Sequence, residues 1–163
     1  MQPATRGETH MFSQDLFDFL DALAENNDRD WFREHKADYE RAVQAPALDF
    51  VAAIAERLPE ISDAFLAIPK KQGGSLFRIY RDTRFSKDKR PYKTHTGMQF
   101  RHRLASRDVH APGFYLHLEP GACMVGFGMW QPPTPTLNRV RDAIVADPDA
   151  WAQLRAGLVQ SGM

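Results

Sequence analysis

The stretch that decides the fold class is GFYLHLEPGACMVGFGMW, residues 113–130 of a 163-residue chain. Two runs of alternating side chains flank a Pro-Gly pair, in which glycine supplies the positive φ of a tight turn. The stretch therefore predicts an antiparallel β-hairpin in which Phe114 faces Phe127 and Leu118 faces Cys123. This face is apolar, and we expect it to lie in the core.

The opposite face of the hairpin carries the polar side chains. It presents Tyr115, His117 and Glu119 together with Gly126 and Gly128, because successive side chains of a strand point to opposite sides. The two glycines leave a shallow gap beside the polar groups. Such a gap can admit a ligand or a closely packed backbone.

Upstream of the hairpin, the N-terminal third has the apolar spacing of helices. A first helix is predicted over 14–25 after an N-cap at Ser13, and Asp28 is placed to cap a second. Pro46 suits the first position of a third helix, and Pro59 is expected to end it.

Two short β-rich runs and two C-terminal helices complete the expected architecture. Strands are predicted over 76–81 and 98–102, and cap signals at Thr134 and Asp147 predict the final helices. The fold class is α+β: a central antiparallel sheet with the Pro-Gly hairpin, and helices from both ends of the chain packed around it. Residues 12–163 are expected to form a single domain.

Composition argues against a membrane protein and against a disulfide-stabilised fold. No apolar run approaches the ~20 residues that span a bilayer, and the N-terminus lacks the apolar core of a secretory signal. The single cysteine, Cys123, cannot form an internal disulfide. We therefore predict a cytoplasmic protein, with residues 1–11 as a disordered leader.

Overall charge is zero, but it is unevenly distributed along the chain. Residues 1–69 carry 6 basic and 14 acidic groups, residues 70–107 carry 12 and 2, and residues 108–163 carry 3 and 5. Much of the positive charge lies in RIYRDTRFSKDKRPYKTH, residues 78–95, which we call the basic segment. Such asymmetry suggests an anionic partner.

The basic segment supplies the donor types that hold phosphate, which are guanidinium forks, ammonium groups and hydroxyls. Nucleotides, phosphosugars and nucleic acid are all candidate ligands. The predicted ligand-binding residues are Arg78, Arg81, Arg84, Lys87, Lys89, Arg90, Lys93 and Tyr92. Phe85 and Tyr92 are also expected to act as packed anchors of the loop. No phosphate-loop or dinucleotide motif accompanies the segment.

Two other functions stay open. The chain could be a protein-interaction or structural domain whose basic loop is neutralised by an acidic surface. It could also be a phosphoester-processing enzyme, with His95 or His117 as the acid-base group. His117 and Glu119 could provide two metal ligands, but zinc needs three or four, so no metal and no cofactor are predicted. The oligomeric state is left open.

Three stretches together resemble a known bacterial family. The resemblance is to the family called domain of unknown function 2461, and it is carried by FDFLDALAENNDRDWF (17–32), LFRIYRDTRFSKDKRPYKTH (76–95) and the hairpin. The resemblance runs from about Phe12 to the helix after Trp130. It implies no catalytic residue, because the family name records no activity. It also implies that members continue beyond Met163, so a C-terminal portion is expected to be absent, and that Met11 is the natural start.

Overall fold

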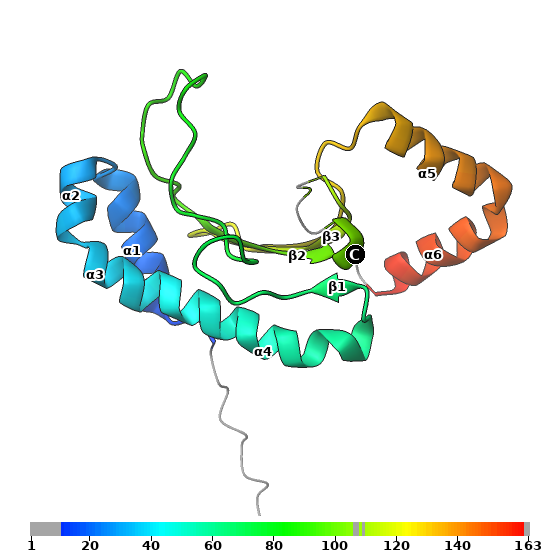
Figure 1. Ribbon diagram of the computed structural model, residues 1–163, viewed down its shortest axis with the longest axis horizontal. Helices are drawn as coiled ribbons and strands as arrows, with labels where there is room; N and C mark the ends of the chain where they lie inside the picture. Colours follow the sequence, from blue (N-terminus) through cyan, green and yellow to red (C-terminus); the bar gives the residue numbers. More distant parts are fainter. Residues whose placement is uncertain (1–10, 106–107, 109, 162–163) are drawn as a thin grey trace, which may run out of the picture. The chain divides into compact units, whose positions relative to one another are not determined.

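The structure is a computed structural model that describes residues 11–105, 108 and 110–161. Helices and a four-stranded antiparallel sheet confirm the α+β class and its Pro-Gly hairpin (Figure 1). The chain divides into two compact units, one ending at Gly128 and the other beginning at Met129. The predicted leader falls on residues that, except for Met11, lie outside the described part.

The first unit opens with a run of helical elements. They are α1 (Gln14–Glu25), α2 (Arg29–Glu34), α3 (Lys36–Tyr39), the π-helix η1 (Glu40–Gln44) and α4 (Ala45–Ile61). The predicted cap of α2 is confirmed, because the Asp28 carboxylate accepts the backbone N–H groups of Asp30 and Trp31, both at 2.9 Å. The start predicted at Pro46 is close: α4 begins one residue earlier, at Ala45, and η1 leads into it without a loop. Pro59 lies inside α4, which ends two residues later.

The sheet has the strand order β1-β2-β3-β4, and each neighbouring pair is antiparallel. The strands are β1 (Phe65–Leu66), β2 (Thr96–His102), β3 (Gly113–Leu118) and β4 (Met124–Gly128), with the 3₁₀ turn η2 (Arg103–Ala105) after β2. The predicted hairpin register is confirmed, because Phe114 pairs with Phe127. The strand expected over 76–81 is wrong: only isolated bridges form there, from Leu76 to Met98 and from Tyr80 to Tyr92.

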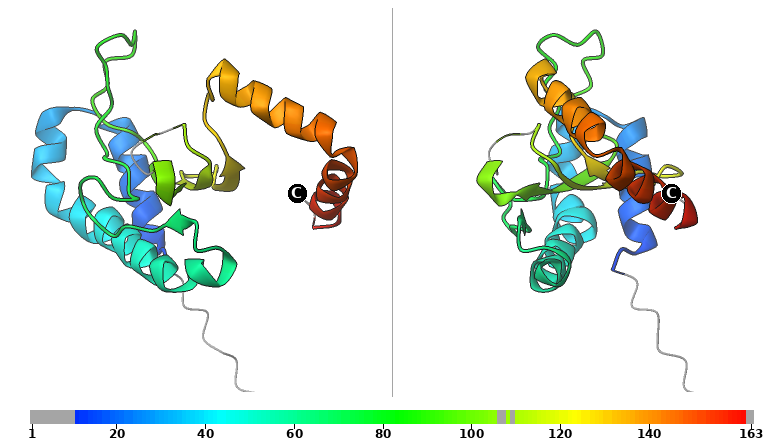
Figure 2. Two further views of the ribbon diagram at one scale, coloured as in Figure 1. Left: turned by 45° about the vertical axis from the view of Figure 1, so that its right-hand side comes forward. Right: turned by 90° about the vertical axis from the view of Figure 1, so that its right-hand side faces the viewer.

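The core lies between the N-terminal helices and one face of the sheet, along which α4 runs (Figures 1 and 2). Leu16, Leu20 and Met98 are fully buried, and Phe114 packs against this core. The apolar hairpin face does not follow the prediction throughout. Phe127 is 62% exposed and Cys123 is exposed as well. The reason is position, because β4 is the edge strand of the sheet, farthest from β1.

The second unit consists of two helices, α5 (Thr134–Ala146) and α6 (Pro148–Gln160). The cap predicted at Asp147 is confirmed by its side chain, which accepts the Ala150 N–H at 2.9 Å. No described residue of either helix is buried. Among the described residues, no helix combines the length and the apolar character needed to cross a bilayer.

Candidate functional sites

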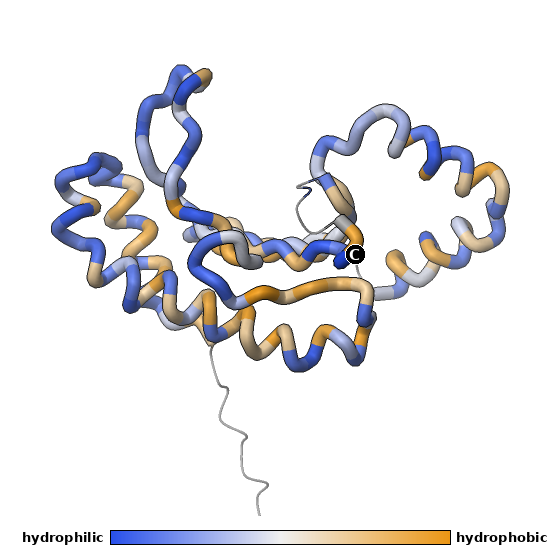
Figure 3. The backbone as a smooth tube through the Cα atoms, in the orientation of Figure 1, coloured by the Kyte–Doolittle hydropathy of each residue, from blue (hydrophilic) through white to orange (hydrophobic). Residues whose placement is uncertain are grey.

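The basic segment is a long loop that extends away from the sheet and is mostly hydrophilic (Figures 1 and 3). Its two ends run side by side, because the Arg81 N–H donates to the Pro91 carbonyl at 2.9 Å and the Lys93 N–H donates to the Ile79 carbonyl at 2.8 Å. Proline has no N–H to return, which keeps this pairing from becoming a regular ladder. Earlier in the run, the Phe77 N–H donates instead to the Gly97 carbonyl of β2, so residues 76–81 change partner and form no continuous strand.

Two aspartates organise the arginines of the loop. Asp82 accepts the backbone N–H of Arg84 at 3.2 Å and its guanidinium at 2.6 and 2.9 Å. Asp88 does the same for Arg90 and also accepts Arg81 at 2.7 Å. The hydrogen bonds from Arg84 lower the pKa of Asp82 to about 2, and those from Arg90 lower the pKa of Asp88. Both carboxylates therefore stay ionised at neutral pH.

The aromatic side chains of the loop behave differently from one another. Tyr92 is buried and stacks on Phe32 with ring centroids 4.1 Å apart, which fits its expected role as an anchor. The Asn27 side chain fixes the same residue, since its amide donates to the Tyr92 carbonyl and accepts the Tyr92 N–H. Phe85 was also expected to be an anchor, and this is wrong: it is 95% exposed near the Arg84 guanidinium.

At the base of the basic segment lies an open groove of about 870 Å³. Its lining includes Arg78, Lys36, Lys71 and Arg101 on the cationic side and Glu40 as an acidic group. Lys36 and Glu40 form an ion pair at 3.8 Å. The positive surface of the exposed loop therefore continues into the groove.

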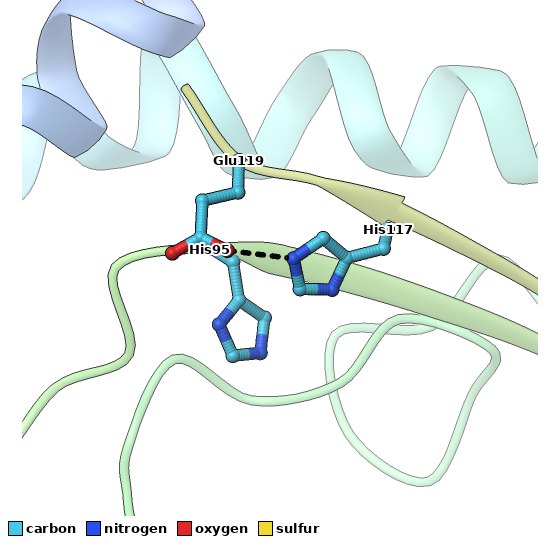
Figure 4. Close-up of side chains that lie close together, drawn as sticks. All are labelled: His95, His117 and Glu119. Atoms are coloured by element: carbon cyan, nitrogen blue, oxygen red, sulfur yellow. Dashed lines mark hydrogen bonds and ion pairs between the residues drawn. The ribbon is translucent and has the colours of Figure 1, made fainter. Parts of the chain in front are cut away.

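A second cluster lies where β2 begins and β3 ends, and we call it the histidine cluster. It consists of His95, His117 and Glu119, whose side chains converge (Figure 4). The donor atoms lie within 4.8 Å of one another, close enough to share one metal ion. The imidazoles of His95 and His117 stack with centroids 4.4 Å apart. All three residues are half-buried.

Hydrogen bonds fix the histidine cluster from both sides. Nε2 of His117 lies 3.0 Å from Oε2 of Glu119, and Nδ1 of His117 lies 3.2 Å from the Tyr115 hydroxyl. The Thr94 hydroxyl donates to Oε1 of Glu119 at 3.2 Å. The hydrogen bond with His117 lowers the pKa of Glu119, whereas burial lowers the pKa of His95. At neutral pH we therefore expect Glu119 to be an anionic carboxylate and His95 to be a neutral imidazole.

His95 joins this cluster through strand pairing that local sequence does not reveal. Gly97 pairs with His117 and Thr96 pairs with Leu118, so His95, directly before β2, lies opposite Glu119. Alternation along β3 identified His117 and Glu119 from sequence. The register between β2 and β3 would have been needed to add His95, and no short turn fixes it.

Gly97 also has a role at this site that the sequence did not indicate. A Cβ atom there would lie 2.6 Å from the Tyr115 hydroxyl, so glycine makes room for that side chain. The gap expected beside Tyr115 lies on β4, where Gly126 pairs with Tyr115 and a Cβ there would meet only the Met124 side chain, at 3.8 Å. A Cβ on Gly128 would meet nothing within 4 Å.

Comparison with known protein families gives a match over most of the chain. A family model described as "Conserved hypothetical protein (DUF2461)" matches residues 15–160, which confirms the resemblance drawn from the sequence. No curated protein and no solved structure matches the chain.

Proposed function

The chain belongs to the DUF2461 family of conserved hypothetical proteins, a description that names no ligand. We propose that the chain binds a phosphate-rich anion through the basic segment. The observation that carries this proposal is a surplus of positive charge. The segment holds seven lysines and arginines but only two carboxylates. Asp82 and Asp88 are already shared among three arginines.

The acidic N-terminal helices do not supply the missing neutralisation. Among the described residues, each ion pair made by the basic segment has both partners inside the segment. The pairs on the N-terminal helices likewise stay within those helices, as for Arg41 with Asp15 and Asp38. This distribution favours an external anion over the alternative in which the protein neutralises its own loop.

Among phosphate-rich anions, single-stranded nucleic acid is the ligand class we favour, because the exposed loop offers both cations for phosphates and an aromatic ring for an unstacked base. Five cations are exposed: Arg78, Arg84, Lys87, Lys89 and Arg90. Phe85 offers an open ring among them, and base stacking on an aromatic ring contributes about 1–3 kcal/mol. The Tyr92 ring stacks on Phe32, so Tyr92 anchors the loop to the N-terminal helices and is not the ring proposed to stack on a base.

Fluorescence anisotropy with a labelled single-stranded oligonucleotide, measured over a range of salt concentrations, tests the proposal. Each phosphate neutralised on a single strand contributes about −0.7 to the slope of log K against log salt. Replacing both Lys87 and Lys89 with glutamine should therefore weaken binding and reduce the slope by about 1.4. The control is Arg57→Gln, an exposed cation on α4, which should change neither.

Phe85→Ala separates nucleic acid from smaller phosphates. Its loss should weaken oligonucleotide binding by about 1–3 kcal/mol while binding of pyrophosphate is unchanged. Equal weakening by the lysine variant and by Arg57→Gln would indicate non-specific attraction and would contradict the proposal. Absence of binding to oligonucleotides, nucleotides and pyrophosphate alike at low salt would also contradict it.

A further inference from the structure

We propose that the histidine cluster binds a divalent transition-metal ion of the zinc type. Two imidazoles and one carboxylate already converge there, with donor atoms within 4.8 Å of one another. This donor set is one that catalytic zinc sites use. The inference does not depend on anion binding: His95 is the last residue of the basic segment, but none of the three ligands is among the side chains proposed to bind the anion.

The hydrogen bonds around His117 suit the ring for metal binding through Nε2. Nε2 lies 3.0 Å from the Glu119 carboxylate, which only accepts when ionised, so the neutral ring without metal carries its proton on Nε2 and accepts the Tyr115 hydroxyl at Nδ1, 3.2 Å away. With metal on Nε2, the proton resides on Nδ1 and is donated to the same hydroxyl oxygen. A hydroxyl can both donate and accept, so Tyr115 holds the ring in either state.

The carboxylate ligand is supported in the same way. Oε1 of Glu119 accepts the Thr94 hydroxyl, while Oε2 is the oxygen that faces His117. Such outer hydrogen bonds orient metal ligands and are a regular part of metal sites. Gly97 completes the arrangement, because any larger residue would place a Cβ only 2.6 Å from the hydroxyl of Tyr115.

The chemistry of the donors narrows the class of metal. Imidazole suits zinc, copper, iron and nickel, whereas magnesium and calcium prefer sites made of oxygen alone. Structural zinc sites generally use four protein ligands, and catalytic sites use three with a position left for water or substrate. Three ligands at a half-buried position therefore indicate a site with exchangeable coordination.

The test is isothermal titration of zinc into the untagged, chelator-stripped 163-residue chain. We expect one zinc ion per chain. Outer-shell changes weaken metal sites by about 10–100-fold, and loss of a ligand in His95→Ala or His117→Ala should weaken zinc binding by at least the upper end of that range. The control is His102→Ala, whose ring packs against Phe65 outside the cluster.

Tyr115→Phe gives a second test that leaves all three ligands in place. It removes only the hydroxyl beside Nδ1, and we expect zinc affinity to fall about 10–100-fold. If an alanine variant fails to fold, the zinc affinities of two single variants, His95→Gln and Tyr115→Phe, replace it in the test. The proposal is overturned if no zinc binds, or if zinc binds with an affinity that none of these variants lowers relative to His102→Ala. If the cluster variants had a lower Tm but unchanged zinc affinity, the cluster would have a purely structural role.

Discussion

Asn27→Ala should loosen the attachment of the basic segment to the N-terminal helices. The Asn27 amide donates to the Tyr92 carbonyl at 3.1 Å and accepts the Tyr92 N–H at 3.0 Å, which joins residues 65 positions apart in the chain. Both bonds are partly buried, so alanine leaves two backbone groups of Tyr92 without these partners. At about 0.5–1.5 kcal/mol for each bond, the free energy of unfolding should fall by about 2 kcal/mol.

Urea and thermal unfolding, followed by tryptophan fluorescence, measure this loss. For a chain of this size, about 2 kcal/mol corresponds to a fall in Tm of roughly 4–8 °C. The neighbouring Asn26→Ala is a matched control, because the Asn26 amide makes an exposed bond to the Ala22 carbonyl. That variant should stay within about 0.5 kcal/mol of wild type. Equal losses in the two variants would refute the idea that Asn27 anchors the basic segment.

Three further changes test other parts of the structure. Gly74→Ala should destabilise by about 1–3 kcal/mol in urea unfolding, because its Cβ would lie 2.5 Å from the carbonyl oxygens of Ile68 and Lys70; wild-type stability would show that the turn adapts. Burial raises the pKa of Tyr39 to about 12, so the unfolded chain ionises first as pH rises. The free energy of unfolding should therefore fall by about 3 kcal/mol between about pH 10 and 12. In Tyr39→Phe the free energy of unfolding should fall less over this pH range. The same alkaline fall in the variant and in wild type would contradict the prediction. Because the pKa of Asp82 is lowered to about 2, its carboxylate stabilises the folded loop above the unfolded pKa, and this stabilisation is lost as pH falls from about 4 to 2. Limited proteolysis of the loop should therefore become faster over this pH range in wild type but not in Asp82→Asn. The same acid dependence in both proteins would contradict this.

Local signals predicted the parts of the fold that local chemistry determines. The hairpin register follows from the Pro-Gly turn, and the start of α2 follows from Asp28, whose carboxylate reaches the first free N–H groups of that helix. The strand expected over 76–81 failed because this run changes partner: Phe77 bonds to Gly97 of β2, whereas Ile79 and Arg81 bond across the loop to residues 93 and 91. Composition reports β propensity but not which segment a run will pair with.

The candidate sites show the same division. The charge of the basic segment is visible in the sequence, but the sharing of Asp82 and Asp88 among three arginines depends on how the loop closes. His117 and Glu119 could be paired by strand alternation, whereas His95 required the register between β2 and β3. Exposure of Phe85 could not be read from its sequence neighbours, since an aromatic residue between cations fits both an anchor and an open ring.

The aspartate turns of the basic segment affect the thermodynamics of recognition. The pattern Asp-x-Arg occurs twice, at Asp82 with Arg84 and at Asp88 with Arg90, and each carboxylate binds both the backbone and the side chain two residues later. Much of the loop's conformational entropy is therefore lost when the protein folds. A partner that meets a pre-organised loop does not have to order it, so more of the contact free energy remains as affinity.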